Sequence, residues 1–141
     1  MDSLLRRNNG ITGTLPERLC PCESGKFYSA CCEPYHNGLA APTAEALMRS
    51  RYTAFVLSLD EYLLQTWHAK TRPVELNLAE DSATKWLGLQ IKNTKKISEK
   101  SASVEFVARY KVAGKAERLH ELSEFEWIAG RWYYLTGSDP R

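Results

Sequence analysis

The sequence lacks any long hydrophobic run. None of its apolar stretches approaches the roughly 20 residues that a membrane-spanning helix needs, so we expect no membrane-embedded segment. The opening residues, MDSLLRRNNGITGTLPERL, have no long apolar region behind their basic pair, and they do not predict a secretory signal. These absences favour a cytoplasmic protein, in a reducing compartment where structural disulfides are rare.

The sequence also lacks a strong excess of either charge. Its formal net charge is +2, with 19 basic and 17 acidic residues, whereas nucleic-acid binding normally requires a concentrated basic face. The small basic cluster Lys92, Lys95 and Lys96 is typical of a solvated loop. Neither a phosphate-binding glycine loop nor a dinucleotide fingerprint is present. We therefore do not expect nucleic acid as a partner.

The chain does contain enough apolar material for one domain. Of its 141 residues, 43% are hydrophobic and 11% are aromatic, and single domains commonly have about 100–150 residues. Residues 1–18 show no clear period and include Gly10, Gly13 and Pro16. This segment is predicted to be a flexible arm.

Helical periodicity begins at Thr43, which can cap a helix whose apolar residues recur through about Leu59. Asp60 is the expected cap of a second, short helix with the sequence EYLLQTW. A third helical patch is predicted within residues 74–81 or 82–86.

After Leu87 the pattern changes to alternation and to residues that favour strands. The expected strands are LGLQIKN, SASVEFVARYKV, ERLHELSEFEWI and RWYYLT, separated by the short segments TKK, AGK and AGR. Connections this short favour antiparallel hairpins. Helices followed by antiparallel strands predict an α+β domain, with the helices packed on one face of the sheet.

All four cysteines of the chain lie in the segment CPCESGKFYSACC, as Cys20, Cys22, Cys31 and Cys32. Four thiolates in a tetrahedron satisfy a structural zinc site. Between the two pairs, Ser24-Gly25 is a turn signal that lets the chain double back. Because so short a segment cannot bury a core, a structural zinc ion would be what folds it.

Three other interpretations of the cysteines stay open. Two disulfides would suit an exported protein, but no export signal is predicted. A redox or catalytic thiol pair would usually read Cys-x-x-Cys beside a parallel sheet, and neither feature is present. Finally, His36 could replace one thiolate, because Cys32-x3-His36 has ligand-like spacing.

The segment resembles the SEC-C motif, Cys-x-Cys-x-Ser-Gly-x5-Cys-[His/Cys], the small zinc tail of the SecA preprotein translocase motor. Its four ligand positions are matched by Cys20, Cys22, Cys31 and Cys32. The chain departs from the motif at Glu23, where the family usually has glycine. A side chain there would shift the turn and slightly weaken the electrostatics of the site, but no ligand is lost.

Longer blocks are similar to the uncharacterised bacterial YchJ-like family: CCEPYHNGLAAPTAEALMRSRYTAFVLSLDEYLLQTWHAKTRP, WLGL and EFEWIAGRWYYLTG. That family joins a SEC-C motif to a nuclear-transport-factor-2-like domain, a strongly curved antiparallel sheet that forms a cone with its helices. The resemblance implies a zinc-binding SEC-C segment at residues 19–36, which we call the cysteine knuckle, and a cone domain at residues 37–141. It implies no reaction, because none is assigned to the family.

A cone of this kind can hold a pocket between helices and sheet, and the residues predicted to line it are Arg49, Arg51, Tyr52, His68 and Glu124. Arg49 and Arg51 are two positions apart on a helix, so at most one faces inward. That arginine would pair with a buried carboxylate such as Glu124 or bind an anionic ligand. His68, after the second helix, would serve as a general acid or as a cap.

The strand around Glu124 does not reveal which of its faces is buried. Alternation places Leu119, Glu121, Ser123, Phe125 and Trp127 on one face and His120, Leu122, Glu124, Glu126 and Ile128 on the other. Because both faces mix polar and apolar residues, the pattern leaves their orientation open.

Two functions follow from these features. In the first, the protein is a cytoplasmic adaptor whose zinc knuckle presents Lys26, Phe27 and Tyr28 to a protein partner. The analogy is with the SecA tail, whose zinc motif engages a chaperone and the ribosome. In the second, the cone pocket binds or converts a small molecule. Cone-fold relatives also suggest a homodimer through the sheet. If the knuckle is a separate unit, replacing Cys22 and Cys31 with serine should unfold residues 19–36 alone.

Overall fold

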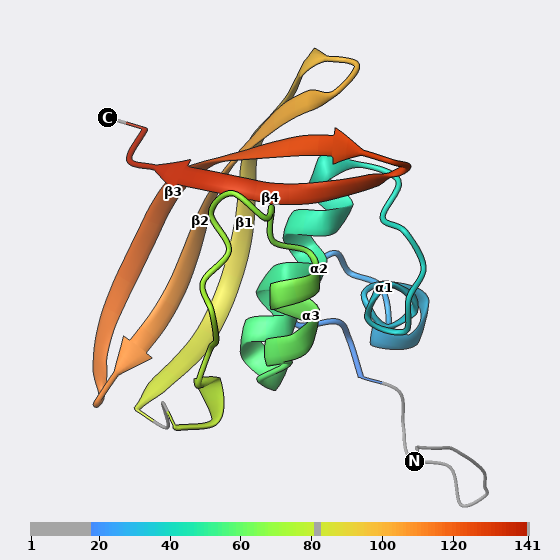
Figure 1. Ribbon diagram of the computed structural model, residues 1–141. Helices are drawn as coiled ribbons and strands as arrows, with labels where there is room; N and C mark the ends of the chain where they lie inside the picture. Colours follow the sequence, from blue (N-terminus) through green and yellow to red (C-terminus); the bar gives the residue numbers. More distant parts are fainter. Residues whose placement is uncertain (1–17, 81–82, 141) are drawn as a thin grey trace, which may run out of the picture.

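In the computed structural model, which describes residues 18–80 and 83–140, a layer of helices packs against a single antiparallel sheet (Figure 1). The α+β class predicted from the sequence is confirmed. The arm predicted at residues 1–18 lies outside the described residues, apart from Arg18.

The sheet consists of four strands that pair in chain order: β1 (Thr84–Ser98), β2 (Ser101–Val112), β3 (Lys115–Ile128) and β4 (Arg131–Ser138). They correspond to the four predicted strands, but β1 is longer than expected: Lys92, Lys95 and Lys96, which were predicted to form a solvated loop, lie within it, and Lys95 and Lys96 pair with Ser103 and Ala102 of β2. The register shifts between Trp86 and Gly88 and between Glu124 and Phe125. Such irregularities bend a strand and increase its local twist. The sheet accordingly curves around the helical layer, as Figure 1 shows.

Two helices lie along the concave side of the sheet, α2 (Ala44–Leu57) and α3 (Asp60–Gln65). The predicted cap of α2 is confirmed, because Thr43 Oγ1 accepts a hydrogen bond of 3.0 Å from the amide of Ala46. The helix ends at Leu57, and the residue that follows, Ser58, has a φ of 58°, in the left-handed region that terminates helices. Within the described part of the chain, no helix is long and apolar enough to cross a membrane.

Asp60, the expected cap of the second helix, is instead the first residue of α3, and Leu59 precedes it without a side-chain cap bond. The third helical patch also differs from the sequence-based prediction. Residues 78–80 form a single 3-10 turn, η2 (Leu78–Glu80), and residues 84–86 belong to β1, while residues 81–82 lie outside the described part. Trp86 pairs with Tyr110 in β2, and its ring packs 5.8 Å from that of Tyr52. Sheet pairing and aromatic packing therefore override a weak local helical pattern.

The hydrophobic core lies between α2 and the concave face of the sheet. Its buried members include Leu47, Met48 and Tyr52 from α2 and Val104, Phe106 and Phe125 from the sheet. Three of the four cysteines, Cys20, Cys22 and Cys32, belong to the same buried cluster. The cysteine knuckle is therefore packed onto the domain and does not hang from it as a separate tail.

Leu63 offers a test of how α3 is packed, because its side chain is fully buried. Leu63→Ala should lower the free energy of unfolding by about 2–5 kcal/mol, since the cavity left behind cannot fully collapse. Leu39→Ala removes the same atoms from an exposed side chain and should cost less than about 1 kcal/mol. Urea unfolding of both variants measures the difference, and equal losses would contradict the described packing.

Candidate metal centre

The sulfur atoms of the four cysteines form a compact cluster in the knuckle. All four Sγ atoms lie within 4.8 Å of one another, with 3.6 Å between Cys22 and Cys31 and 3.9 Å between Cys31 and Cys32. Sulfurs bound tetrahedrally to zinc at about 2.3 Å would be about 3.8 Å apart. The cluster thus has the dimensions of a four-thiolate metal site. Disulfide sulfurs would be only about 2.0 Å apart, and all four cysteines are free.

A tight loop brings the two cysteine pairs together. Leu19 and Phe27 form an antiparallel bridge on either side of the first pair. The turn predicted at Ser24-Gly25 is present, with Gly25 at a φ of 88°, which glycine adopts without strain. Ser24 Oγ lies 3.1 Å from Cys31 Sγ. The second pair, Cys31 and Cys32, follows a 3-10 turn, η1 (Tyr28–Ala30), and precedes the short helix α1 (Glu33–His36).

Helix α2 supports the sulfurs from the domain side. The hydroxyl of Thr53 donates to Cys32 Sγ at 3.4 Å and lies 3.6 Å from Cys20 Sγ. Arg49 Nη1 donates to the carbonyl of Cys22 at 2.7 Å, while its Nε bonds to Glu45 at 3.0 Å. Such outer contacts orient ligands and restrict their motion. The folded domain therefore holds the cluster in its arrangement.

The surroundings of the cluster shift the pKa values of Cys22, Cys31 and Cys32 in opposite directions. Hydrogen bonds from Cys20 and Cys32 stabilise the Cys22 thiolate and lower its pKa. The hydrogen bonds that Cys32 makes to Cys20 and Cys22 raise the pKa of Cys32, and burial raises the pKa of Cys31. The thiolate of Cys22 is thus stabilised by hydrogen bonds from its neighbours. A divalent ion at the centre would offset the repulsion and allow all four sulfurs to be anionic.

His36 is engaged elsewhere and does not replace a cysteine. Its Nε2 lies 2.9 Å from the carbonyl oxygen of Ser50, which can only accept, so Nε2 carries the hydrogen. Nδ1 then accepts the hydrogen bond of 2.7 Å from the Tyr28 hydroxyl. Burial lowers the pKa of His36, which agrees with a neutral ring. Both ring nitrogens are therefore occupied, Nε2 by a bond to α2 and Nδ1 by a bond within the knuckle, despite the ligand-like spacing after Cys32.

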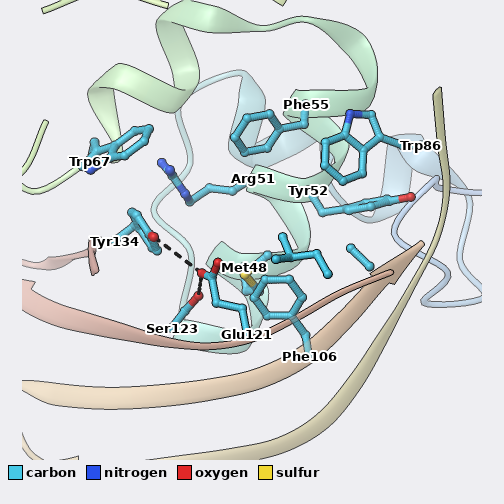
Figure 2. Close-up of a pocket in the computed structure, with 12 residues that line it drawn as sticks. Met48, Arg51, Tyr52, Phe55, Trp67, Trp86, Phe106, Glu121, Ser123 and Tyr134 are labelled. Atoms are coloured by element: carbon cyan, nitrogen blue, oxygen red, sulfur yellow. Dashed lines mark hydrogen bonds between the residues drawn. The ribbon is translucent and has the colours of Figure 1, made fainter. Parts of the chain in front are cut away.

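A cavity of about 130 Å³ lies on the other side of α2, against the concave face of the sheet (Figure 2). Its walls are largely aromatic and include Tyr52, Phe55, Trp67, Trp86, Phe106 and Tyr134. Polar groups come from Arg51 on α2 and from Glu121 and Ser123 on β3. The expected pocket between helices and sheet therefore exists.

Only one of the two α2 arginines faces this cavity. Arg51 and its neighbour Tyr52 line it, whereas Arg49 contacts the knuckle on the opposite side of the helix. The opposite orientation follows from the 100° turn per residue of an α-helix, which puts positions two apart about 160° away from each other.

Arg51 is held deep in the protein by groups from α3 and β4. Its Nη1 donates to the carbonyl of Leu63 at 2.8 Å and to Thr66 Oγ1 at 2.7 Å. Its guanidinium carbon lies 4.9 Å from the ring centre of Trp67 and 4.6 Å from that of Tyr134, within the range of cation–π contacts. Burial lowers the pKa of Arg51 to about 10, so the side chain stays charged at neutral pH.

Two residues predicted for the pocket lie elsewhere. His68 Nε2 bonds to Glu126 at 2.8 Å, and its Nδ1 accepts from the amide of Lys70 at 3.0 Å. Glu124 is exposed on the outer face of β3. Glu121 lines the cavity in its place, because the face it shares with the buried Phe125 is the one turned toward α2.

Comparison with known proteins places the chain in a family. A family model described as the middle, nuclear-transport-factor-2-like domain of YchJ matches residues 43–137. The chain belongs to the YchJ-like family. A UPF0225 protein of Chromobacterium violaceum is 54% identical over 123 residues, covering 84% of this chain and 90% of its own. A UPF0225 protein of Cupriavidus metallidurans is 50% identical over 137 residues, covering 92% and 94%.

Two solved structures share the architecture of this YchJ-like chain. A SEC-C motif containing protein from Rhodopseudomonas palustris, determined in solution, is 32% identical with a TM-score of 0.78, covering 86% of this chain and 98% of that one. The crystal structure of a SEC-C motif containing protein from Psychrobacter arcticus is 34% identical with a TM-score of 0.71, covering 83% and 80%. The family and the cone-like α+β fold expected from the sequence are confirmed.

The structure accommodates Glu23, the departure from the SEC-C pattern. Its φ of 63° lies in the left-handed region, which explains why glycine suits this position. Its Oε2 accepts a hydrogen bond of 2.8 Å from the amide of Leu89 in β1 and lies 3.7 Å from Arg109 Nη2. A side chain at Gly88 would collide with both charged groups. Glu23 thus attaches the knuckle to the sheet.

Substitutions of Glu23 separate the effect of its hydrogen bond from the effect of its strained backbone. Glu23→Ala keeps the strained backbone and loses the hydrogen bond to Leu89, so the free energy of unfolding should fall by about 1–2 kcal/mol. Glu23→Gly loses the same bond but relieves the strain, and should be about 1 kcal/mol more stable than the alanine variant. Urea unfolding of the metal-loaded proteins measures both. Equal stability of the two variants would show that the backbone is not strained.

Removing the metal tests whether the knuckle and domain form one folding unit. Because Cys20, Cys22 and Cys32 belong to the buried cluster with α2, chelation should lower the thermal midpoint of the whole domain by about 10 °C or more. Near-ultraviolet circular dichroism reports on the aromatic core and measures this shift. In the variant with Cys22 and Cys31 replaced by serine, the chelator should have no further effect.

Two results would contradict this interpretation, one for the metal site and one for the shared core. Protein purified without chelator should contain one metal ion per chain by elemental analysis, and metal-free protein would refute the site. A domain transition that stays in place after chelation would instead support the simpler expectation that only residues 19–36 unfold.

Proposed function

We propose that this protein is an adaptor that binds a protein partner through a zinc-ordered cysteine knuckle. The observation that carries the proposal is an exposed apolar pair on the knuckle's outer surface. Leu19 is 64% exposed and Phe27 is 47% exposed, and the antiparallel bridge between them places the two side by side. Paired apolar side chains left in water are typical of an interaction site.

Zinc is the metal that the donor set favours. Four cysteine sulfurs at tetrahedral spacing suit zinc, and the resemblance to SEC-C motif proteins points the same way. With four protein ligands the coordination sphere is closed, so a bound metal has no open position for water or substrate. The zinc in this proposal is therefore structural. Four reduced thiolates also suit the reducing cytoplasm, where we place the protein.

The metal supports recognition by fixing the loop that carries the apolar pair. The cysteine side chains point inward to the cluster while Leu19 and Phe27 point outward. A loop already held in its bound shape loses less conformational entropy on association. Tyr28, which the sequence grouped with the presented residues, instead uses its hydroxyl to bond to His36. Its role in the proposal is to support the knuckle.

Charge indicates the chemistry of the partner. The exposed side chains of Arg18 and Lys26 flank the apolar pair, and among the described residues neither takes part in an ion pair. Basic side chains around an apolar centre complement a segment that combines apolar and acidic residues. We therefore assign the partner as a protein with such an acidic, apolar segment.

The test compares two double variants of the zinc-loaded protein. Leu19→Ser with Phe27→Ser removes the apolar pair, whereas Ile97→Ser with Val112→Ser removes apolar side chains of similar exposure, 58% and 39%, from the sheet. Proteins captured from a lysate by the unaltered chain are purified and their affinity for each variant is measured. The knuckle variant should bind at least about tenfold more weakly, with zinc content unchanged, and the sheet variant should bind normally. Equal affinities for the two variants would refute the proposal.

A further inference from the structure

The cavity beside α2 contains a buried positive charge that makes no direct ion pair with any described residue, although Glu121 attracts it from across the cavity. Arg51 is 3% exposed, yet no carboxylate of residues 18–80 or 83–140 lies within ion-pair distance of it. Of its three guanidinium nitrogens, only Nη1 makes hydrogen bonds to described residues. Buried charges in proteins are normally paired. The remaining donors of Arg51 are therefore available to a ligand carboxylate, which matches their fork geometry.

A carboxylate that can accept further hydrogen bonds lies across the cavity from Arg51. Glu121 Oε2 accepts from Ser123 Oγ at 2.7 Å and from the Tyr134 hydroxyl at 3.5 Å, while its Oε1 has no hydrogen-bond partner among the described residues. A side chain at Gly137 in β4 would collide with this carboxylate, so the bare glycine makes room for it. Tyr134 lies between the two charges, with its ring against Arg51 and its hydroxyl on Glu121.

The polar and apolar parts of the cavity are separated in space. Figure 2 shows Arg51 extending between Trp67 and Tyr134 on one side, with Tyr52, Phe55 and Trp86 gathered on the other. A surface groove of about 540 Å³ shares Phe55, Trp86 and Leu119 with the cavity. A ligand entering from this groove would pass the aromatic side chains first and place its polar end near Arg51.

The size of the cavity limits the ligand. Its volume of about 130 Å³ is close to that of an engineered cavity of about 150 Å³ that holds benzene. A branched aliphatic side chain or a small ring therefore fits, and a nucleotide or a sugar chain does not. The apolar lining excludes a wholly polar ligand, since it offers no partners for additional polar groups.

We propose that this cavity binds a small α-amino or α-hydroxy acid with an apolar side chain. Arg51 binds the carboxylate, Glu121 accepts from the neighbouring ammonium or hydroxyl group, and the side chain lies among Tyr52, Phe55 and Trp86. A ligand with a carboxylate alone would leave Glu121 facing an anion, and one with an amine alone would leave Arg51 facing a cation. The site is separate from the knuckle surface and does not depend on the proposed adaptor function.

Four related probes test the ligand class on the zinc-loaded protein. L-leucine carries both polar groups with an ammonium, L-leucic acid carries both with a hydroxyl, isocaproate carries only the carboxylate, and isoamylamine carries only the amine. Binding is measured by calorimetry and by shifts of the indole resonances of Trp67 and Trp86. At least one of the first two should bind, and isocaproate and isoamylamine should each bind at least about tenfold more weakly. Preference for leucine assigns an amino acid, and preference for leucic acid assigns a hydroxy acid.

Three variants test the residues. Arg51→Lys keeps the charge but loses the planar fork, and Glu121→Gln keeps the shape but loses the charge; each should weaken binding roughly ten- to hundredfold. Glu124→Gln makes the same change as the second variant on the exposed face of β3 and should leave affinity within about twofold of the unaltered protein. If Arg51→Lys does not fold, the proposal is tested by comparing the ligand affinity of Glu121→Gln with that of Glu124→Gln. The proposal would be overturned if none of the four probes binds, if isocaproate binds as tightly as the better of leucine and leucic acid, or if Glu121→Gln leaves the affinity of that better ligand unchanged.

Discussion

The packing of α2 between the cysteine cluster and the concave face of the sheet is the contact on which both sites depend. One side of the helix carries Thr53, whose hydroxyl contacts the sulfurs of Cys20 and Cys32. The other side carries Arg51 and Tyr52, which line the cavity. Because these residues are consecutive on one helix, α2 supplies both a support for the cysteines and a wall of the cavity. The cysteine cluster and the cavity therefore lie on opposite sides of the same helix.

Contacts at β1 join the knuckle to the sheet directly. The carboxylate of Glu23 bonds to the amide of Leu89, next to the glycine at position 88 that leaves room for it. The hydroxyl of Tyr52 also bonds to the backbone of Gly88. One short segment of β1 thus receives contacts from the knuckle and from α2. The Glu23 contact is partly exposed and weak as an ion pair, so its main effect is to set the position of the knuckle.

Local sequence patterns were sufficient to predict much of this architecture. The cap at Thr43, the four strands and the turn at Ser24-Gly25 each depend on a few neighbouring residues, and all are present. The predicted helical patch near Trp86 failed because that residue pairs with Tyr110 across the sheet, a contact that no local window contains. The ligand-like spacing of His36 was equally local, and its ring nitrogens found other partners through folding.

The spacing of the cysteines and the resemblance of the flanking blocks were enough to predict the cysteine cluster and the family, because both depend on residues close together in the sequence. The lining of the cavity depends on packing. Both faces of β3 mix polar and apolar residues, so alternation pairs Glu121 with Phe125 but does not say which face is covered. Only when α2 packs on the sheet does Phe125 become buried, which turns Glu121 inward and leaves Glu124 in solvent.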